Sequence, residues 1–256
     1  MATLCQCGFY SESLGKCVGV NVILPRSSRS NDGVGKTVSQ RKYYPVLYLL
    51  HGLSDDNTIW SRRSAIELYA MNYECIIVMP DGGRSFYRNM ASKARYKDFI
   101  TRDLINFVEG TFPAISDRKS RFICGLSMGG YGAMALGFEF SDLYSKIGAF
   151  SSVADVQFFA DKYLDPVERK SIFGGDKISP QDDLFVLSSQ VVKSRNCPAL
   201  FLACGTEDFL YKCNCNYRKH LDSIGFKYTY VEKEGNHSWY FWDEQIRNAL
   251  KFFMEK

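Results

Sequence analysis

The segment Gly125-Leu126-Ser127-Met128-Gly129 has the residue types and the spacing of a catalytic serine turn. A short predicted strand precedes it and a segment rich in small residues follows it. In the pattern G-x-S-x-G, the serine occupies a tight turn between a strand and a helix, and this turn exposes its hydroxyl. A side chain at Gly125 or Gly129 would crowd the neighbouring backbone. The segment therefore predicts that Ser127 is a nucleophile.

A serine hydroxyl needs a base to accept its proton, and the chain contains three histidines. His237 follows the last predicted strand and lies downstream of Ser127, where the base belongs when a nucleophile occupies this kind of turn. His51 ends the first central strand, and we expect it to be structural, with hydrogen bonds inside its loop. His220 lies in the middle of a predicted helix, on a face expected to be solvated. We therefore predict His237 as the base.

An acidic residue must orient the imidazole of the base and stabilise its cation. The predicted strand before the last one is followed by Gly205-Thr206-Glu207-Asp208. Both carboxylates of this turn are candidates. Asp208 is the favoured acid and Glu207 is the alternative.

The negative charge of a tetrahedral intermediate needs two amide donors. The Met128 amide is one candidate, because it follows the nucleophile at the start of a helix. The loop after the first central strand, His51-Gly52-Leu53, is expected to supply the other from the Leu53 amide. This arrangement needs no metal ion. The pairs Cys5-Gln6-Cys7 and Cys213-Asn214-Cys215 have one intervening residue, which is too few for a typical zinc site.

The hydrophobic pattern predicts the elements that would position these residues. Strands are expected over 3–10, 17–24, 45–50, 75–79, 121–124, 146–150, 198–204 and 226–231, and helices over 62–73, 98–110, 128–138, 211–224 and 240–253. Strands that alternate with helices favour a mostly parallel sheet with helices on both faces. The predicted class is α/β, in a single domain over residues 1–256.

Two segments interrupt this alternation of strands and helices. Residues 152–195 are expected to be an irregular, cap-like insertion over the active site. Residues 25–42 are polar and read as a surface loop. This loop contains Gly35-Lys36-Thr37, but Ser30 stands where a phosphate-binding loop requires its first glycine.

Composition excludes several classes of protein. Hydrophobic residues make up 46% of the chain and charged residues 23%, which excludes a disordered protein. The net charge of +4 is too small to indicate nucleic-acid binding. No apolar run approaches the roughly 20 residues of a membrane span, and no secretory leader is visible. The nine cysteines are expected to be reduced thiols in the cytoplasm.

In its motifs, the chain resembles the esterase D group of α/β hydrolases. This group includes S-formylglutathione hydrolases, feruloyl and acetyl-xylan esterases and bacterial tributyrin esterases. The resemblance rests on Tyr48-Leu49-Leu50-His51-Gly52, Trp60, Met79-Pro80-Asp81-Gly82, Arg84-Ser85-Phe86-Tyr87, the run from Gly125 to Ala133, Phe173-Gly174, Ser179-Pro180-Gln181-Asp182-Asp183-Leu184, Gly205-Thr206-Glu207-Asp208 and Gly235-Asn236-His237-Ser238-Trp239.

The resemblance implies an α/β-hydrolase fold and a triad of Ser127, Asp208 and His237. It also implies an oxyanion hole at Leu53 and Met128, and an expected activity on short acyl esters without a cofactor. Hydrolysis of thioesters such as S-formylglutathione, or of acetylated-sugar and feruloyl esters, is the alternative activity, and a non-catalytic binding protein is the alternative outside enzymes. The expected partner is a small-molecule ester, and a homo-oligomer is compatible with the sequence.

Loop positions also suggest where the substrate would lie. Trp60, Tyr87 and Trp239 follow predicted strands, together with Phe86, and are expected around the mouth of the site. Their apolar rings would form a wall suited to short acyl chains.

Overall fold

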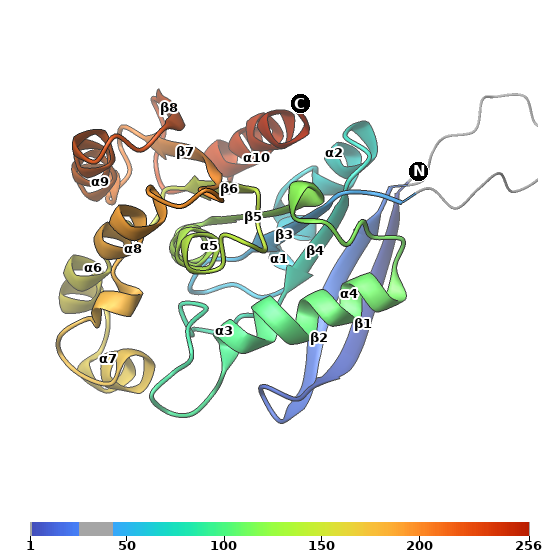
Figure 1. Cartoon of the computed structure of the whole chain (residues 1–256), viewed down its shortest axis with the longest axis horizontal. Coiled ribbons are helices and arrows are strands. Elements are labelled where there is room, and N and C mark those ends of the chain that lie inside the picture. The colour runs from blue at the N-terminus through green and yellow to red at the C-terminus, as the bar shows by residue number, and fades with distance from the viewer. Residues whose placement is uncertain (1, 26–42, 256) are drawn as a thin grey trace, which may run out of the picture.

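The computed structural model describes residues 2–25 and 43–255. Eight strands form one sheet in the order β1-β2-β4-β3-β5-β6-β7-β8 (Figure 1). They are β1 (Thr3–Ser11), β2 (Lys16–Leu24), β3 (Val46–Leu50), β4 (Ile76–Pro80), β5 (Arg121–Leu126), β6 (Lys146–Phe150), β7 (Ala199–Gly205) and β8 (Tyr228–Lys233). The β1–β2 hairpin pairs antiparallel with β4, and all later neighbours are parallel. The α/β class with a mostly parallel sheet is therefore confirmed.

The central strands are buried on both faces, which explains their continuous apolar sequence. Every residue of β3, β4 and β5 is buried. Because side chains alternate along a strand, Tyr48 points into one hydrophobic cluster, whereas Leu47 and Leu49 point into another. Strands enclosed between two helical layers have this composition.

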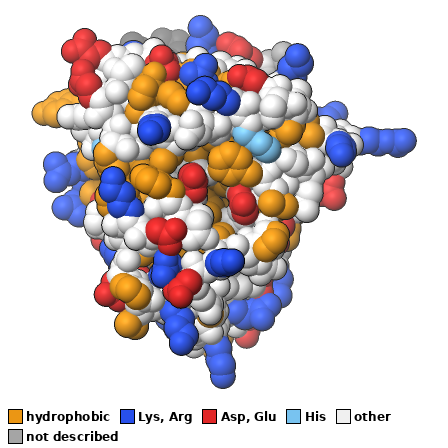
Figure 2. Space-filling model, turned by 90° about the vertical axis from the view of Figure 1, so that its left-hand side faces the viewer, with side chains coloured by type: hydrophobic (Ala, Val, Ile, Leu, Met, Phe, Trp, Pro, Cys, Tyr) orange, Lys and Arg blue, Asp and Glu red, His pale blue; other side chains and the backbone are white. Residues whose placement is uncertain are grey.

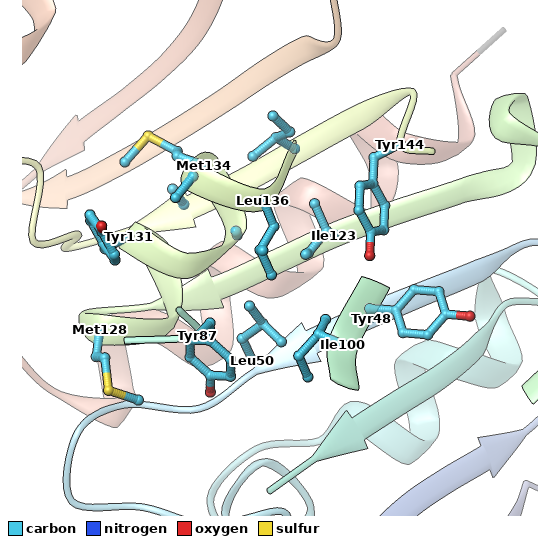
Figure 3. Packing of buried hydrophobic residues seen from close by; sticks show 14 of the residues in the cluster. Tyr48, Leu50, Tyr87, Ile100, Ile123, Met128, Tyr131, Met134, Leu136 and Tyr144 are labelled. Carbon is cyan, nitrogen blue, oxygen red and sulfur yellow. The ribbon is translucent and has the colours of Figure 1, made fainter. Parts of the chain in front are cut away.

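Helices cover the two faces of the sheet (Figure 1). The layer formed by α1 (Ile59–Arg63), α2 (Ile66–Asn72) and α10 (Trp239–Met254) packs on the face of Leu47. The opposite layer contains α4 (Leu104–Thr111), α5 (Met128–Glu139), α8 (Leu184–Val191) and α9 (Tyr211–Ser223). Figure 3 shows part of this second cluster, in which Leu136 of α5 packs near Ile123 of β5. The two layers leave the carboxyl ends of the parallel strands free to carry a site.

Two helices differ from their predicted bounds by more than one residue at an end. The single helix expected over 62–73 is divided into α1 and α2, because the Ser64 hydroxyl and amide both bond to the Trp60 carbonyl and end the first helix. The helix expected over 98–110 begins with α3 (Tyr96–Asp98). It continues through a π-helical turn (Phe99–Asp103) into α4.

The insertion over 152–195 is helical, so the expectation of an irregular segment was wrong. It contains α6 (Val156–Tyr163), α7 (Pro166–Phe173), a 3-10 turn (Pro180–Asp182) and α8. The side chains of Asp155, Asp165 and Asp183 each accept hydrogen bonds from the first backbone amides of the helix that follows. An aspartate just before a helix is a common capping residue, and Pro166 suits the first helical position.

A buried arginine ties this insertion to the body of the protein. Arg88 is 2% exposed, and its Nε lies 2.6 Å from Asp182 of the 3-10 turn. Its Nη2 donates to the Gln181 carbonyl and lies 2.8 Å from Glu139 of α5. The hydroxyl of Tyr131, also in α5, donates to the Asp182 carbonyl at 2.6 Å. These bonds fix the 3-10 turn against α5.

The sequence also predicts a polar loop over 25–42 and no membrane span. Apart from Pro25, the loop lies outside the described residues. None of the helices in the described ranges combines the length and the apolar character needed to cross a bilayer.

We expect Arg88→Met to destabilise the fold by about 3 kcal/mol, because it leaves the Asp182 carboxylate buried without its cation. Urea unfolding measures this loss. Lys233→Met is the control: it removes the cation of an ion pair with Glu244 in which both side chains are exposed, and should cost less than about 1 kcal/mol. Equal losses in the two variants would contradict the role given to Arg88.

Candidate active site

Ser127 lies in the turn between β5 and α5, in a strained backbone conformation. Its φ is 53° and its ψ is −117°, which is rare for a residue other than glycine. A Cβ added at Gly125 would lie 2.4 Å from the backbone of Gly129, and one added at Gly129 would lie 2.6 Å from the Leu50 carbonyl oxygen. The sharp turn therefore needs both glycines, as the sequence predicts. The Ser127 amide donates to the Phe150 carbonyl at 2.9 Å, which holds the turn on β6.

The predicted acid and base lie after neighbouring strands and are in contact. Nδ1 of His237, after β8, lies 2.9 Å from Oδ2 of Asp208, after β7. The Asp208 side chain is fully buried, whereas that of His237 is 20% exposed. The alternative acid, Glu207, is exposed. Because the carboxylate accepts the Nδ1 hydrogen, the lone pair on Nε2 of His237 is free to accept another proton.

Ser127 and His237 face one cavity of about 560 Å³. Its lining is formed by Gly52, Leu53, Ser54, Asp55, Arg63, Leu126, Ser127, Phe159, Phe209, His237, Ser238, Trp239, Tyr240 and Trp242. The structure thus brings the three predicted residues of the triad to one place, with Asp208 behind His237. A serine, an imidazole and a buried carboxylate in this order can carry out acyl transfer.

The two residues predicted to supply oxyanion donors lie at the same cavity as Ser127 or next to it in the chain. Leu53 lines the cavity, and Met128 is the first residue of α5, where a backbone amide has no acceptor within the helix. His51 is buried and hydrogen-bonded, as expected for a structural role. Its Nδ1 lies 2.7 Å from the Gly52 carbonyl, and its Nε2 accepts the Gly82 amide at 2.9 Å. These partners require the tautomer in which Nδ1 carries the hydrogen.

Two of the three residues expected at the mouth of the site are core residues instead. Trp60 is 1% exposed and donates from Nε1 to the Leu50 carbonyl, because α1 packs on the face of the sheet. Tyr87 is fully buried beside α5 and donates to the His51 carbonyl at 2.9 Å, and burial raises its pKa (Figure 3). Phe86 is fully buried as well. Only Trp239 lines the cavity, so the predictions for Trp60 and Tyr87 were wrong.

Other aromatic residues form the wall, and sequence reasoning missed them. Phe209 is 49% exposed and its ring centre lies 4.6 Å from that of His237. Trp242 packs edge-on against His237 at 4.8 Å. Phe159 of α6 and Tyr240 complete the aromatic lining. Trp239 and Trp242 are three residues apart, which places both on one side of a helix. This spacing is the sequence signal that could have identified Trp242 as part of the wall.

The insertion helices extend this apolar surface outward. Phe158 and Tyr163 of α6 are about 40% exposed, and Tyr163 packs against Phe209 at 5.4 Å. Figure 2 shows hydrophobic side chains gathered across the middle of this face, with charged side chains of both signs around them. The rim of the cavity is therefore apolar on the side of the insertion.

His220 takes no part in this cluster, but it is not on a solvated face as expected. It is half-buried between α9 and α8, and its Nε2 lies 3.0 Å from the Phe185 carbonyl and 3.2 Å from Ser188 Oγ. A histidine held in this way packs two helices together.

The cavity also has two charged side chains. Asp55 is half-buried, and burial raises its pKa. Arg63 is exposed. Within the described residues, no three or more His, Cys, Asp or Glu side chains form a group that could hold a metal ion.

Comparison with known proteins agrees with this geometry. Residues 11–253 match the model of the esterase family described as "Putative esterase". The acetyl esterase of Caldicellulosiruptor saccharolyticus is 30% identical over an alignment of 258 positions, gaps included, that covers 96% of each chain.

Two solved structures from Staphylococcus aureus are also similar over nearly the full length. The fluorophosphonate-binding serine hydrolase FphF has a TM-score of 0.89 at 29% identity, with 100% of this chain and 99% of that chain covered. The S-formylglutathione hydrolase FrmB has a TM-score of 0.88 at 28% identity, with both chains covered completely. The chain belongs to the esterase family of serine hydrolases with the α/β-hydrolase fold.

Proposed function

We propose that the protein is a carboxylesterase that hydrolyses short acyl esters through an acyl-enzyme on Ser127. The contact between His237 and the buried Asp208, at the edge of the cavity that Ser127 faces, is the observation that carries this proposal. In the first step, Nε2 of His237 accepts the Ser127 proton while Oγ attacks the ester carbonyl carbon. The carbonyl π electrons move to oxygen, which accepts hydrogen bonds from the Leu53 and Met128 amides.

The remaining steps reverse the direction of proton transfer. The tetrahedral intermediate collapses, the bond to the leaving oxygen breaks, and Nε2 of His237 gives its proton to the departing alcohol. Water then enters, loses a proton to His237, and attacks the acyl carbon. Collapse of the second intermediate releases the acid and returns the proton to Ser127. Asp208 stabilises the imidazolium in both halves of the reaction.

The free thiols support the cytoplasm as the compartment. All nine cysteines lie in the described residues, and all nine are free. Burial raises the pKa of the Cys75 and Cys124 thiols, which keeps them in the unreactive neutral form. Free thiols persist in a reducing compartment.

We predict that Ser127→Ala abolishes ester hydrolysis and leaves the fold intact, because the side chain lies in a turn whose backbone is set by its neighbours. The measurements are turnover of p-nitrophenyl acetate and covalent labelling by a fluorophosphonate. Both signals should vanish while the unfolding midpoint changes little. Labelling at another serine in the variant would reject Ser127 as the nucleophile.

We predict that His237→Ala lowers kcat by a factor on the order of 10⁶, as expected for loss of the base of a triad. His220→Ala should change kcat less than about twofold, and should instead lower stability by about 1 kcal/mol through loss of its bond to α8. Because the base must be neutral, kcat/KM of the wild type should decrease as the pH is lowered and His237 becomes protonated. A fully active His237→Ala enzyme would place the base elsewhere.

We predict the highest kcat/KM for acetyl to butyryl esters. Each added methylene contributes about 0.8 kcal/mol until the aromatic wall is filled, and further growth costs about 1–3 kcal/mol. A series of p-nitrophenyl esters should therefore show a drop of about tenfold or more at octanoyl. Faster turnover of palmitoyl than of butyryl esters would show that the cavity opens into a long channel.

A second cavity favours one alternative substrate class, thioesters or esters with an anionic leaving group. It measures about 600 Å³ and shares Arg63, Trp239 and Tyr240 with the first. Arg62 adds a second guanidinium, while the Asp243 carboxylate accepts hydrogen bonds from the Ala65 amide and the Tyr69 hydroxyl. A long leaving group that extends from the first cavity past Trp239 into the second, and that itself bears a carboxylate, would place this carboxylate beside Arg63.

Arg63→Gln tests this alternative. The ratio of kcat/KM for S-formylglutathione to that for neutral p-nitrophenyl acetate should fall roughly threefold, in line with the loss of one exposed charge pair. Added salt should reduce the same ratio in the wild type. An unchanged ratio under both conditions would leave neutral esters as the favoured class.

A further inference from the structure

The direction of the Leu53 amide depends on the two peptide groups that flank this residue. A trans peptide group is planar, so its N–H and C=O point in opposite directions. The Leu53 N–H shares its peptide group with the Gly52 carbonyl. The Leu53 carbonyl belongs to the next peptide group. A bond to the Gly52 carbonyl orients the plane that carries the Leu53 N–H, and a bond to the Leu53 carbonyl restrains the rotation of that plane about Leu53.

His51 holds the first of these carbonyls. The Gly52 oxygen accepts from His51 Nδ1 at 2.7 Å and from the Asp55 amide at 3.3 Å. On its other side, the imidazole accepts the Gly82 amide at 2.9 Å, which ties the ring to the end of β4. A donor on the carbonyl side also polarises the peptide group, and this strengthens the opposite N–H as a donor.

Arg84 holds the second carbonyl. Its Nη1 donates to the Leu53 oxygen at 3.3 Å. The backbone of Arg84 is itself fixed, because the Gly83 amide donates to Asp81 and the Ser85 hydroxyl donates to the Gly82 carbonyl. A guanidinium is planar, so its remaining donors determine how it is oriented.

Those remaining donors bind the insertion. Nε and Nη2 of Arg84 donate to the two carboxylate oxygens of Glu168, at 2.5 and 3.0 Å. Glu168 lies in the first turn of α7, which is capped by Asp165 and has Pro166 at its first position. The two parallel bonds align the guanidinium plane with this helix. Arg84 therefore joins α7 of the insertion directly to the carbonyl of Leu53.

We propose that Arg84 is a positioning residue that couples helix α7 to the oxyanion hole, with Glu168 as its orienting partner. The inference rests on the proposed function, because it assigns the oxyanion role to the Leu53 amide. When α7 and Glu168 are in place, Arg84 draws the Leu53 carbonyl toward itself and keeps the amide aimed at the reacting oxygen. When Glu168 is lost, the guanidinium turns toward solvent and the second anchor of Leu53 is released.

This role predicts a loss in kcat rather than in KM. The oxyanion forms only in the transition state, so a misaligned donor leaves ground-state binding unchanged. Removal of a whole oxyanion donor lowers kcat by about 10²–10³-fold, and a donor that loses one of two anchors should lose about three- to tenfold. The Arg84 side chain is 52% exposed, and an exposed ion pair of this kind adds little to stability.

The experiment compares Arg84→Gln, Glu168→Gln and the double variant on p-nitrophenyl acetate. Rates are expressed per active site, with the sites counted by fluorophosphonate labelling. Each single variant should lose about three- to tenfold in kcat with KM within about twofold, and the double variant should lose no more than Arg84→Gln alone. Affinity for a trifluoromethyl ketone, which forms a tetrahedral adduct with the serine, should fall by the same factor as kcat/KM.

Two further variants separate positioning from general effects. Arg84→Lys keeps the charge but loses the fork of donors, so it should behave like Arg84→Gln. Arg102→Gln removes an exposed, paired arginine of the π-helical turn, which donates to Ser13 of the β1–β2 hairpin, and should retain full kcat. Unchanged kcat in Arg84→Gln or Glu168→Gln, or losses that multiply in the double variant, would overturn the coupling. Absence of labelling at Ser127 in the wild type would instead refute the proposed function.

Discussion

The close approach of α5 to β3 and β5 is the constraint on which the site depends. Gly129 lies so near the carbonyls of Leu50 and His51 that a Cβ would meet each at 2.6 Å. Backbone therefore packs on backbone, with no side chain between the serine turn and the loop that carries Leu53. This contact places the nucleophile beside the loop that carries the Leu53 amide, whereas the Met128 amide is the next one along the chain. A larger residue would move the turn and disturb all three groups together.

The acid and the base depend on a similar contact between the loops after β7 and β8. A Cβ at Gly205 would lie 2.1 Å from the Gly235 carbonyl oxygen, and the Glu207 amide donates to that same oxygen at 3.0 Å. The two loops are thus joined through backbone at the edge of a parallel sheet. Asp208 and His237 then meet because their strands are neighbours. The insertion adds the apolar rim, and Arg84 and Glu168 connect it to the loop after β3.

The sequence predicted the parts of the molecule that local rules govern. The eight strands and the positions of Ser127, Asp208 and His237 follow from short-range patterns and from the order of elements. Trp60 and Tyr87 were misplaced because loop position does not reveal which way a side chain points. Helix α1 turns Trp60 inward, and the hydrogen bond to His51 holds Tyr87 below α5. The link from Arg84 to Glu168 spans 84 residues, and no local pattern contains such information.

Rapid-quench mass spectrometry of the enzyme mixed with p-nitrophenyl acetate tests the central claim most directly. The account predicts one acetyl group per active chain, formed within the burst of p-nitrophenol and located on the peptide that contains Ser127. His237→Ala should form this species far more slowly, because the serine proton has no acceptor. An acetyl group on another residue, or a burst without any covalent species, would contradict the account.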